Sequence, residues 1–132
     1  MLTRITMRPH QRVLVAEDHP GMSAAIRRLV VAGGFEVAGS VDDGAKVAEE
    51  AARLRPDIII LDLNMPNRSG IDACRELTRM LTRTRIIVVT AEDPVLVRPA
   101  ALAAGAFAFV EKQAMHTDLL PAVRLACQEL AA

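Results

Sequence analysis

The chain has 132 residues, of which 52% are hydrophobic and 24% charged, and its formal net charge at pH 7 is zero. This length suits one domain with a sizeable core, and the balanced charge argues against a domain that binds nucleic acid by bulk electrostatics. No apolar run is long enough to cross a bilayer, and residues 1–11 lack a signal-peptide cleavage site. We therefore expect a cytoplasmic protein.

Strand patterns and helix patterns alternate along the chain. Short β-branched runs indicate strands, and apolar residues at helical spacing indicate the segments between them. In chain order we expect a strand over 12–17, a helix over 22–31, a strand over 35–40, a helix over 45–54, a strand over 58–61, a helix over 71–81, a strand over 86–90, a fourth helix, a strand over 106–110 and a helix over 118–130. This alternation predicts an α/β fold with a parallel sheet and helices on both faces, formed by residues 11–132 after an extension of residues 1–10.

A proline and a capping residue set the expected starts of the last two helices. Inside the fourth helix, Pro99 would remove a hydrogen bond and clash one turn back, at a cost of about 3 kcal/mol, whereas proline is well tolerated at a helix start. We therefore expect this helix to begin at about Arg98, with 92–97 as a long loop. Thr117 is the predicted N-cap of the last helix, which places Pro121 in its first turn.

Polar side chains follow four of the apolar strands. These residues are Glu17 and Asp18, then Asp62, Thr90 and Lys112. Because the carboxyl ends of parallel strands lie along one edge of an α/β sheet, they are predicted to form a single site. Taken one at a time, each residue could equally be a helix cap, a turn former or a solvated side chain, but five of them at one edge favour a site.

The chemistry of these side chains suits phosphoryl transfer. Packed carboxylates raise one another's pKa unless a cation is present, and Mg²⁺ prefers such oxygen ligands. The ion would neutralise charge on a transferring phosphoryl group. Asp62 is then the candidate nucleophile, Lys112 a cation for a phosphate oxygen, and Thr90 a hydroxyl donor.

Over about residues 11–131 the chain resembles the receiver domain of bacterial two-component response regulators. The matching segments are Val13–Pro20, Pro56–Pro66, Ser69-Gly70, Val88–Ala91 and Ala104–Lys112. The resemblance is closest to the subgroup that usually carries a C-terminal helix-turn-helix domain. It implies a flavodoxin-like, doubly wound sheet of five parallel strands in the order 2-1-3-4-5, with five helices.

The resemblance also implies individual roles. Asp62 would accept phosphate from a phosphohistidine on a sensor histidine kinase, and Lys112 would pair with the phosphoryl group. Mg²⁺ would be held by Glu17, Asp18, Asp62 and the carbonyl of Asn64. Thr90 and Phe109 would form the switch, with Thr90 moving to the phosphoryl group and Phe109 turning inward. We further predict that Asn64 and Glu92, which flank the expected path of water, set the rate of dephosphorylation.

The leading functional hypothesis is a phosphorylation switch whose output face is formed by the fourth helix, the fifth strand and the fifth helix. We expect the receiver part of a transcriptional regulator, which would reach DNA only through a domain absent from these residues. A stand-alone receiver, acting by protein contacts or a phosphorelay, is the alternative, and homodimerisation is left open. The chain itself is not expected to bind nucleic acid or membrane.

Two hypotheses from other classes are weaker. A metal-dependent phosphatase would use an acid two residues after the nucleophile for proton transfer, and Asn64 cannot transfer that proton, so we do not expect a conventional enzyme. A binding module that ignores phosphate is disfavoured because every residue of the acceptor site is present.

Overall fold

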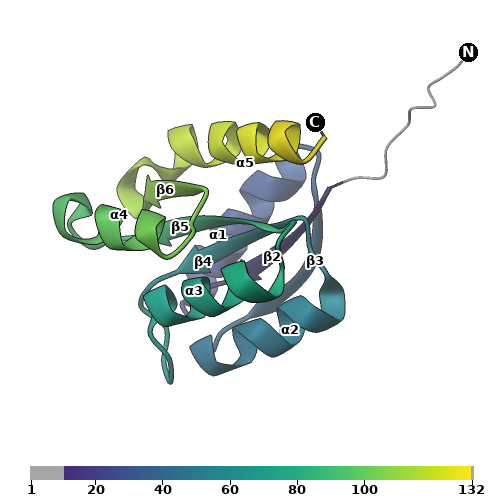
Figure 1. Ribbon diagram of the computed structural model, residues 1–132. Helices are drawn as coiled ribbons and strands as arrows, with labels where there is room; N and C mark the ends of the chain where they lie inside the picture. Colours follow the sequence, from purple (N-terminus) through teal and green to yellow (C-terminus); the bar gives the residue numbers. More distant parts are fainter. Residues whose placement is uncertain (1–10, 132) are drawn as a thin grey trace, which may run out of the picture.

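The chain is described over residues 11–131 by a computed structural model (Figure 1). The expected extension, residues 1–10, lies outside the described residues. The strands are β2 (Arg12–Ala16), β3 (Glu36–Val41), β4 (Ile58–Asp62), β5 (Arg85–Thr90) and β6 (Ala108–Glu111). The helices are α1 (Pro20–Ala32), α2 (Val47–Leu54), α3 (Gly70–Met80), α4 (Pro94–Ala103) and α5 (Met115–Ala131), with short 3-10 turns η1 (Gly44–Lys46) and η2 (Lys112–Ala114).

The predicted fold class is confirmed. The five strands are parallel and lie in the order β3-β2-β4-β5-β6, which is the order 2-1-3-4-5 in chain numbering. The central strands are aliphatic and fully buried because helices cover both faces of the sheet. Within the described part of the chain, no helix is long and apolar enough to cross a membrane.

Alternate residues of β4 point to two separate cores. Ile59 and Leu61 pack with buried side chains of α2, α3 and α4. Ile58 and Ile60 pack with buried side chains of α1 and α5. This period of two places α1 and α5 on one face of the sheet and the other three helices on the opposite face, as Figure 1 shows. The strand ends are left open for a site.

The expectation for the fourth helix is wrong. α4 begins at Pro94 rather than near Arg98, and residues 94–97 are helical instead of forming a loop. Asp93 caps the helix because its Oδ1 accepts a hydrogen bond from the Val95 N–H at 2.9 Å. Pro99 lies inside the helix and denies the carbonyl of Val95 its usual partner. Val95 is 79% exposed, so water can satisfy that carbonyl, and the cap at Asp93 favours the early start.

The expected start of the last helix is also wrong. α5 begins at Met115 instead of about Asp118, directly after η2. Thr117 is not its N-cap, and its hydroxyl donates to the carbonyl of Ala114 at 3.0 Å. Pro121 consequently lies inside the helix and not in its first turn. The physical reason is burial, since Met115 packs into the same core as Leu119 of α5, and this packing favours helical geometry one turn earlier.

Candidate functional site

The strand register brings the predicted residues to one edge of the sheet. Ala16 of β2 lies opposite Leu61 of β4, so Glu17 and Asp62 both follow directly at the strand ends. Asp62 lies opposite Val89, the residue before Thr90. Thr90 in turn lies opposite Glu111, the residue before Lys112. The polar residues at the ends of four strands therefore lie at neighbouring positions along this edge.

Three carboxylates form the centre of this edge. One oxygen each from Glu17, Asp18 and Asp62 lie within 4.8 Å of one another. Glu17 and Asp62 are each only 2% exposed, whereas Asp18 is exposed. The cluster is thus rigidly held by two buried acids and accessible from solvent on the side of Asp18.

Lys112 is the cation that faces these acids. Its Nζ lies 2.9 Å from Glu17 Oε1 and 3.5 Å from Asp62 Oδ1. Burial lowers the pKa of Lys112, but the two carboxylates outweigh that effect and hold the pKa above its ordinary value. The ammonium therefore pairs more closely with Glu17 Oε1 than with Asp62 Oδ1. A carboxylate oxygen has two lone pairs, so Glu17 Oε1 can accept from Lys112 and still bind a further ligand.

Asp62 is strongly perturbed by its surroundings. The pKa of Asp62 is raised to about 6, mainly by burial and also by the negative charges of Glu17 and Asp18. The N–H of Asn64, 3.3 Å from Asp62 Oδ1, and the ammonium of Lys112 oppose this rise in pKa. A cation bound among the three acids would relieve their repulsion. Hard carboxylate oxygens from three acids, two of them buried and all within 4.8 Å of one another, fit a divalent ion such as Mg²⁺.

Thr90 and Phe109 lie close to this cluster in the fold but are not joined to it. Thr90 is fully buried, and its Oγ1 accepts a hydrogen bond from the Glu92 N–H at 3.1 Å. Phe109 is half-buried and packs against the core on the α2–α4 face of the sheet. Among residues 11–131, no hydrogen bond or ion pair links either side chain to the acids. Asn64 and Glu92 are exposed beside the site.

A cavity adjoins the cluster on the side of β5 and β6. It has a volume of about 270 Å³ and its lining includes Thr90, Glu92, Lys112 and Gln113. Thr90 and Lys112 therefore line the same cavity.

Sequence reasoning missed a supporting role for His19. The backbone N–H of His19 donates to Glu17 Oε2 at 3.1 Å and so orients that carboxylate. Its imidazole Nδ1 accepts from the Met22 N–H at 3.2 Å and caps α1. The signal was present, because Pro20 favours a first helical position, which makes the preceding residue the cap.

Comparison with known proteins identifies the family. The sequence model of the response regulator receiver domain matches residues 13–124. The transcriptional regulatory protein PdtaR of Mycobacterium tuberculosis is 35% identical over 116 residues, which cover 88% of this chain and 56% of that protein. The chemotaxis protein CheY of Thermotoga maritima is 33% identical over 102 residues, which cover 77% of this chain and 85% of that protein.

A solved structure gives the same result in three dimensions. A two-component response regulator of the LuxR family from Aurantimonas sp. SI85-9A1 superposes with a TM-score of 0.84 at 27% identity, over 93% of this chain and 86% of that one. The chain spans about half the length of PdtaR and of several other curated relatives. The family model matches most of the chain, and the sheet order and the acidic strand-end cluster agree with it. The chain therefore belongs to the family of response regulator receiver domains.

Proposed function

We propose that the chain is a phosphorylation-dependent signalling switch whose phosphoryl acceptor is Asp62. The observation that carries this proposal is the position of Asp62, a buried strand-end carboxylate between two other acids and 3.5 Å from the ammonium of Lys112. A carboxylate held in this way is rigid, reachable and paired with a cation suited to a phosphoryl oxygen.

The proposed step is transfer from a phosphohistidine of a sensor histidine kinase. An oxygen of Asp62 attacks phosphorus, the phosphorus–nitrogen bond breaks, and its electron pair returns to the imidazole of the kinase. The product is an acyl phosphate on Asp62. Lys112 would exchange its contacts with Glu17 and Asp62 for the new phosphoryl oxygens. Mg²⁺, held by Glu17, Asp18, Asp62 and the carbonyl of Asn64, would neutralise the negative charge that gathers there.

The switch would be operated by Thr90 and Phe109. The Thr90 hydroxyl is free to donate, because its present hydrogen bond is one that it accepts from the Glu92 N–H. Movement of this hydroxyl towards the phosphoryl group would vacate space near β6, and the half-buried ring of Phe109 would turn into it. Phosphorylation would thereby bias an equilibrium between two arrangements of this region.

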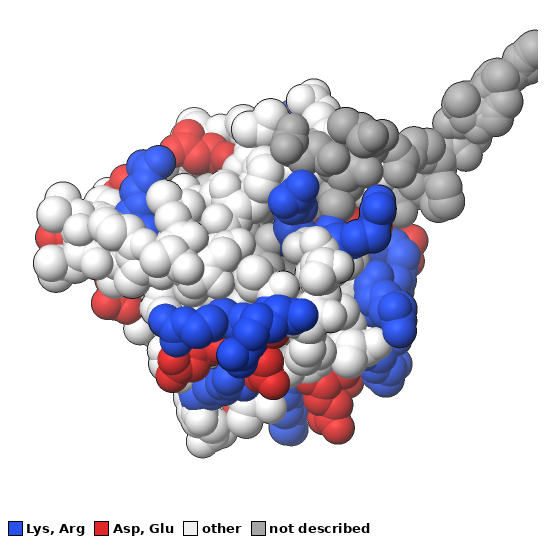
Figure 2. Space-filling view, in the orientation of Figure 1, with Lys and Arg blue, Asp and Glu red and all other residues white. Residues whose placement is uncertain are grey.

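The output face would be formed by α4, β6 and α5. Val95 and Leu96 of α4 are 79% and 74% exposed, and the surface over this helix is nearly free of charge in Figure 2. Apolar side chains in such positions favour a surface that contacts another protein. A second copy of this chain or a downstream domain would be the natural partner.

The lifetime of the phosphate would be set by Asn64 and Glu92. Both side chains are exposed beside the acceptor, where they can orient or exclude an attacking water. Asn64 cannot transfer a proton, so the chain would release its own phosphate slowly and would not turn over external substrates as a phosphatase does. Replacing either residue is expected to change the phosphate lifetime, and unchanged lifetimes would contradict these roles.

The relatives of the chain indicate which kind of protein would contain this switch. PdtaR is a transcriptional regulatory protein and is longer than this chain, so we propose that the chain is the receiver part of a cytoplasmic transcriptional regulator. DNA would be bound only by another domain. CheY is matched over most of its length, and it supports the alternative of a stand-alone receiver that acts through protein contacts.

Mass spectrometry of the intact chain tests the acceptor chemistry. Incubation with a small phosphodonor and Mg²⁺ should add one phosphoryl group. The Asp62→Asn variant should gain none, whereas the control Asp72→Asn, which changes an exposed acid paired with Arg75, should gain as much as the wild type. Failure of the wild type to gain phosphate would favour a binding module instead.

A further inference from the structure

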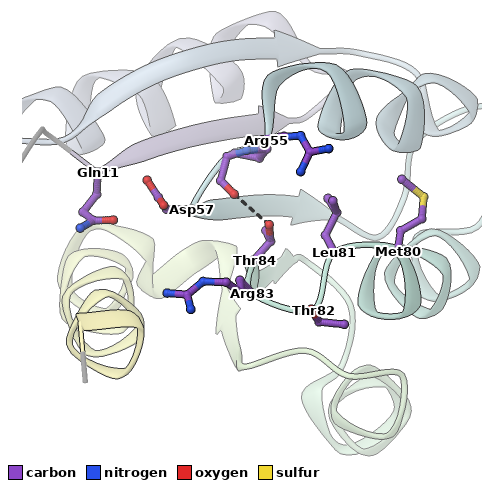
Figure 3. Close-up of a pocket in the computed structure, with 9 residues that line it drawn as sticks. Gln11, Arg55, Asp57, Met80, Leu81, Thr82, Arg83 and Thr84 are labelled. Carbon is purple, nitrogen blue, oxygen red and sulfur yellow. Dashed lines mark hydrogen bonds between the residues drawn. The ribbon is translucent and has the colours of Figure 1, made fainter.

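A second cleft lies at the opposite edge of the sheet from Asp62. It has a volume of about 370 Å³ and is formed by the residues before β4 and by the turn between α3 and β5 (Figure 3). The five residues of β4 separate the two edges by roughly 16 Å. The cleft is lined by Gln11, Arg55, Pro56, Asp57, Met80, Leu81, Thr82, Arg83 and Thr84. None of these residues takes part in the acidic site.

Two arginines supply the positive charge of this cleft. Arg55 and Arg83 lie on either side of the hydrogen bond, 2.8 Å long, from the Thr84 hydroxyl to the Pro56 carbonyl (Figure 3). Neither guanidinium forms an ion pair with another residue in 11–131. By contrast, Arg53 two residues earlier is paired with Glu50 at 2.7 Å. The arginines of the cleft therefore keep their donors for an anion from outside the chain.

The backbone of the turn adds further donors. Thr84 closes the turn by donating its N–H to the Leu81 carbonyl at 3.3 Å. The two residues between them, Thr82 and Arg83, form no hydrogen bond with any other described residue. Their N–H groups and the Arg83 guanidinium thus offer several donors from one short segment, an arrangement suited to phosphate oxygens.

The conformation of Arg55 is unusual for its residue type. Arg55 ends α2 in the left-handed region, with φ of 48°, a position in which glycine is normally favoured. Asn67 is the other non-glycine residue with positive φ in the described part of the chain, and asparagine tolerates this region. Arginine at such a C-cap has no local advantage, which is consistent with a function for its side chain at the cleft.

The remaining lining residues favour a ligand that has polar and apolar groups in addition to an anionic group. Asp57 accepts a hydrogen bond from the Arg12 N–H through Oδ2 at 2.8 Å, which leaves Oδ1 to accept from hydroxyl or amino groups. At the other end of the cleft, Met80 and Leu81 are apolar, and Met80 is 41% exposed. A flat ring could rest on these side chains. Phosphate donors, an acceptor and an apolar surface in one cleft match the parts of a nucleotide.

We propose that this cleft binds a nucleotide, with the phosphates at the Thr82–Arg83 turn and the Arg83 guanidinium, the ribose or base amino groups at Asp57, and the base against Met80 and Leu81, where Arg55 can donate to it from the opposite side of the cleft (Figure 3). The volume of the cleft lies in the range of small-molecule sites. A bound nucleotide would join the end of α2 to the α3–β5 turn. This gives the receiver a second input that is independent of the phosphoryl acceptor.

An NMR titration of the full chain tests this proposal. ADP is added to labelled protein in EDTA, which keeps divalent ions out of the acidic site, and backbone amide shifts are followed. We expect saturable shifts at Thr82, Arg83 and Asp57. Inorganic pyrophosphate and ribose 5-phosphate should bind about tenfold or more weakly, since each lacks the base.

Variants distinguish binding in the cleft from nonspecific attraction to positive charge. Arg83→Ala and Arg55→Gly should each weaken ADP about tenfold, and glycine at position 55 suits the left-handed C-cap, so that variant should fold. Arg98→Ala, which removes an exposed arginine on α4, should leave ADP binding unchanged. The absence of saturable shifts, equal affinity for pyrophosphate, or equal weakening by Arg98→Ala would each overturn the proposal.

Discussion

The two edges of the sheet carry opposite charges in opposite environments. At the carboxyl edge, Glu17 and Asp62 are almost fully buried and Lys112 lies between them. At the amino edge, Arg55 and Arg83 are exposed and lack ion pairs among the described residues. Burial strengthens the interactions at the first edge, so Glu17 raises the pKa of Asp62 and both carboxylates raise the pKa of Lys112, whereas solvent screens the charges of the second edge. Mutations at the carboxyl edge should therefore change stability and its pH dependence more than mutations at the amino edge.

The largest effect on stability is expected for Lys112→Ala. Removing this ammonium leaves the buried carboxylates of Glu17 and Asp62 without their cation, which should lower the free energy of unfolding at pH 7 by about 3 kcal/mol. Denaturant unfolding without divalent metal measures this change. The other lysine of the chain supplies the control, since Lys46 is exposed and Lys46→Ala should change stability little. Similar losses for both variants would remove the contrast between the edges.

The next effect is a gain in stability for Asp62→Asn. The pKa of Asp62 is raised by folding to about 6, so folding disfavours the charged form. The carboxyl of Asp62 makes its full contribution to the free energy of unfolding below its unfolded pKa, near 3.9. That contribution is lost as the pH rises through about 6. Asparagine avoids that loss, and at pH 7 without Mg²⁺ the variant should be more stable by about 2 kcal/mol. The gain should vanish below pH 4, and a gain independent of pH would contradict the raised pKa.

Mg²⁺ affinity should depend on pH for the same reason. Binding requires the ionised carboxylate of Asp62, whose pKa is raised to about 6 by burial and by Glu17. Affinity should fall about tenfold per pH unit below 6 and level off above 7. Calorimetric titration at several pH values measures this slope. A flat profile between pH 5 and 7 would mean that Asp62 is already ionised throughout that range.

The smallest effect is expected at the amino edge. Arg83→Ala removes an exposed side chain that has no partner among the described residues, so stability should change by less than about 0.5 kcal/mol at any pH. Thermal unfolding at low and high salt measures this. A loss comparable with that of Lys112→Ala would show that the arginines of this edge are coupled into the fold.

The gathering of polar side chains at the carboxyl edge was predictable because it depends on local patterns. Apolar runs such as Ile58–Leu61 fix where strands end, and parallel strands align those ends, so Glu17, Asp62 and Thr90 could be placed together without coordinates. The raised pKa of Asp62 could be predicted in direction only. Its size depends on burial and on the position of Lys112, which the sequence does not specify.

Both incorrect helix starts were predicted from local signals. The cost of Pro99 inside a helix favoured a later start for α4, and Thr117 as an N-cap favoured a later start for α5. In the folded chain the cap at Asp93 and the burial of Met115 favour the earlier starts at Pro94 and Met115. Tertiary packing and capping together outweigh a single local penalty.

By itself, the sequence determined the parallel α/β sheet and the gathering of polar residues at its carboxyl edge, because hydrophobic periodicity and strand ends are local properties. Only the tertiary structure decided how deeply Asp62 is buried, where α4 and α5 begin, and that Arg55 and Arg83 face one cleft. These features depend on residues far apart in the chain, whose packing determines burial, helix limits and shared cavities.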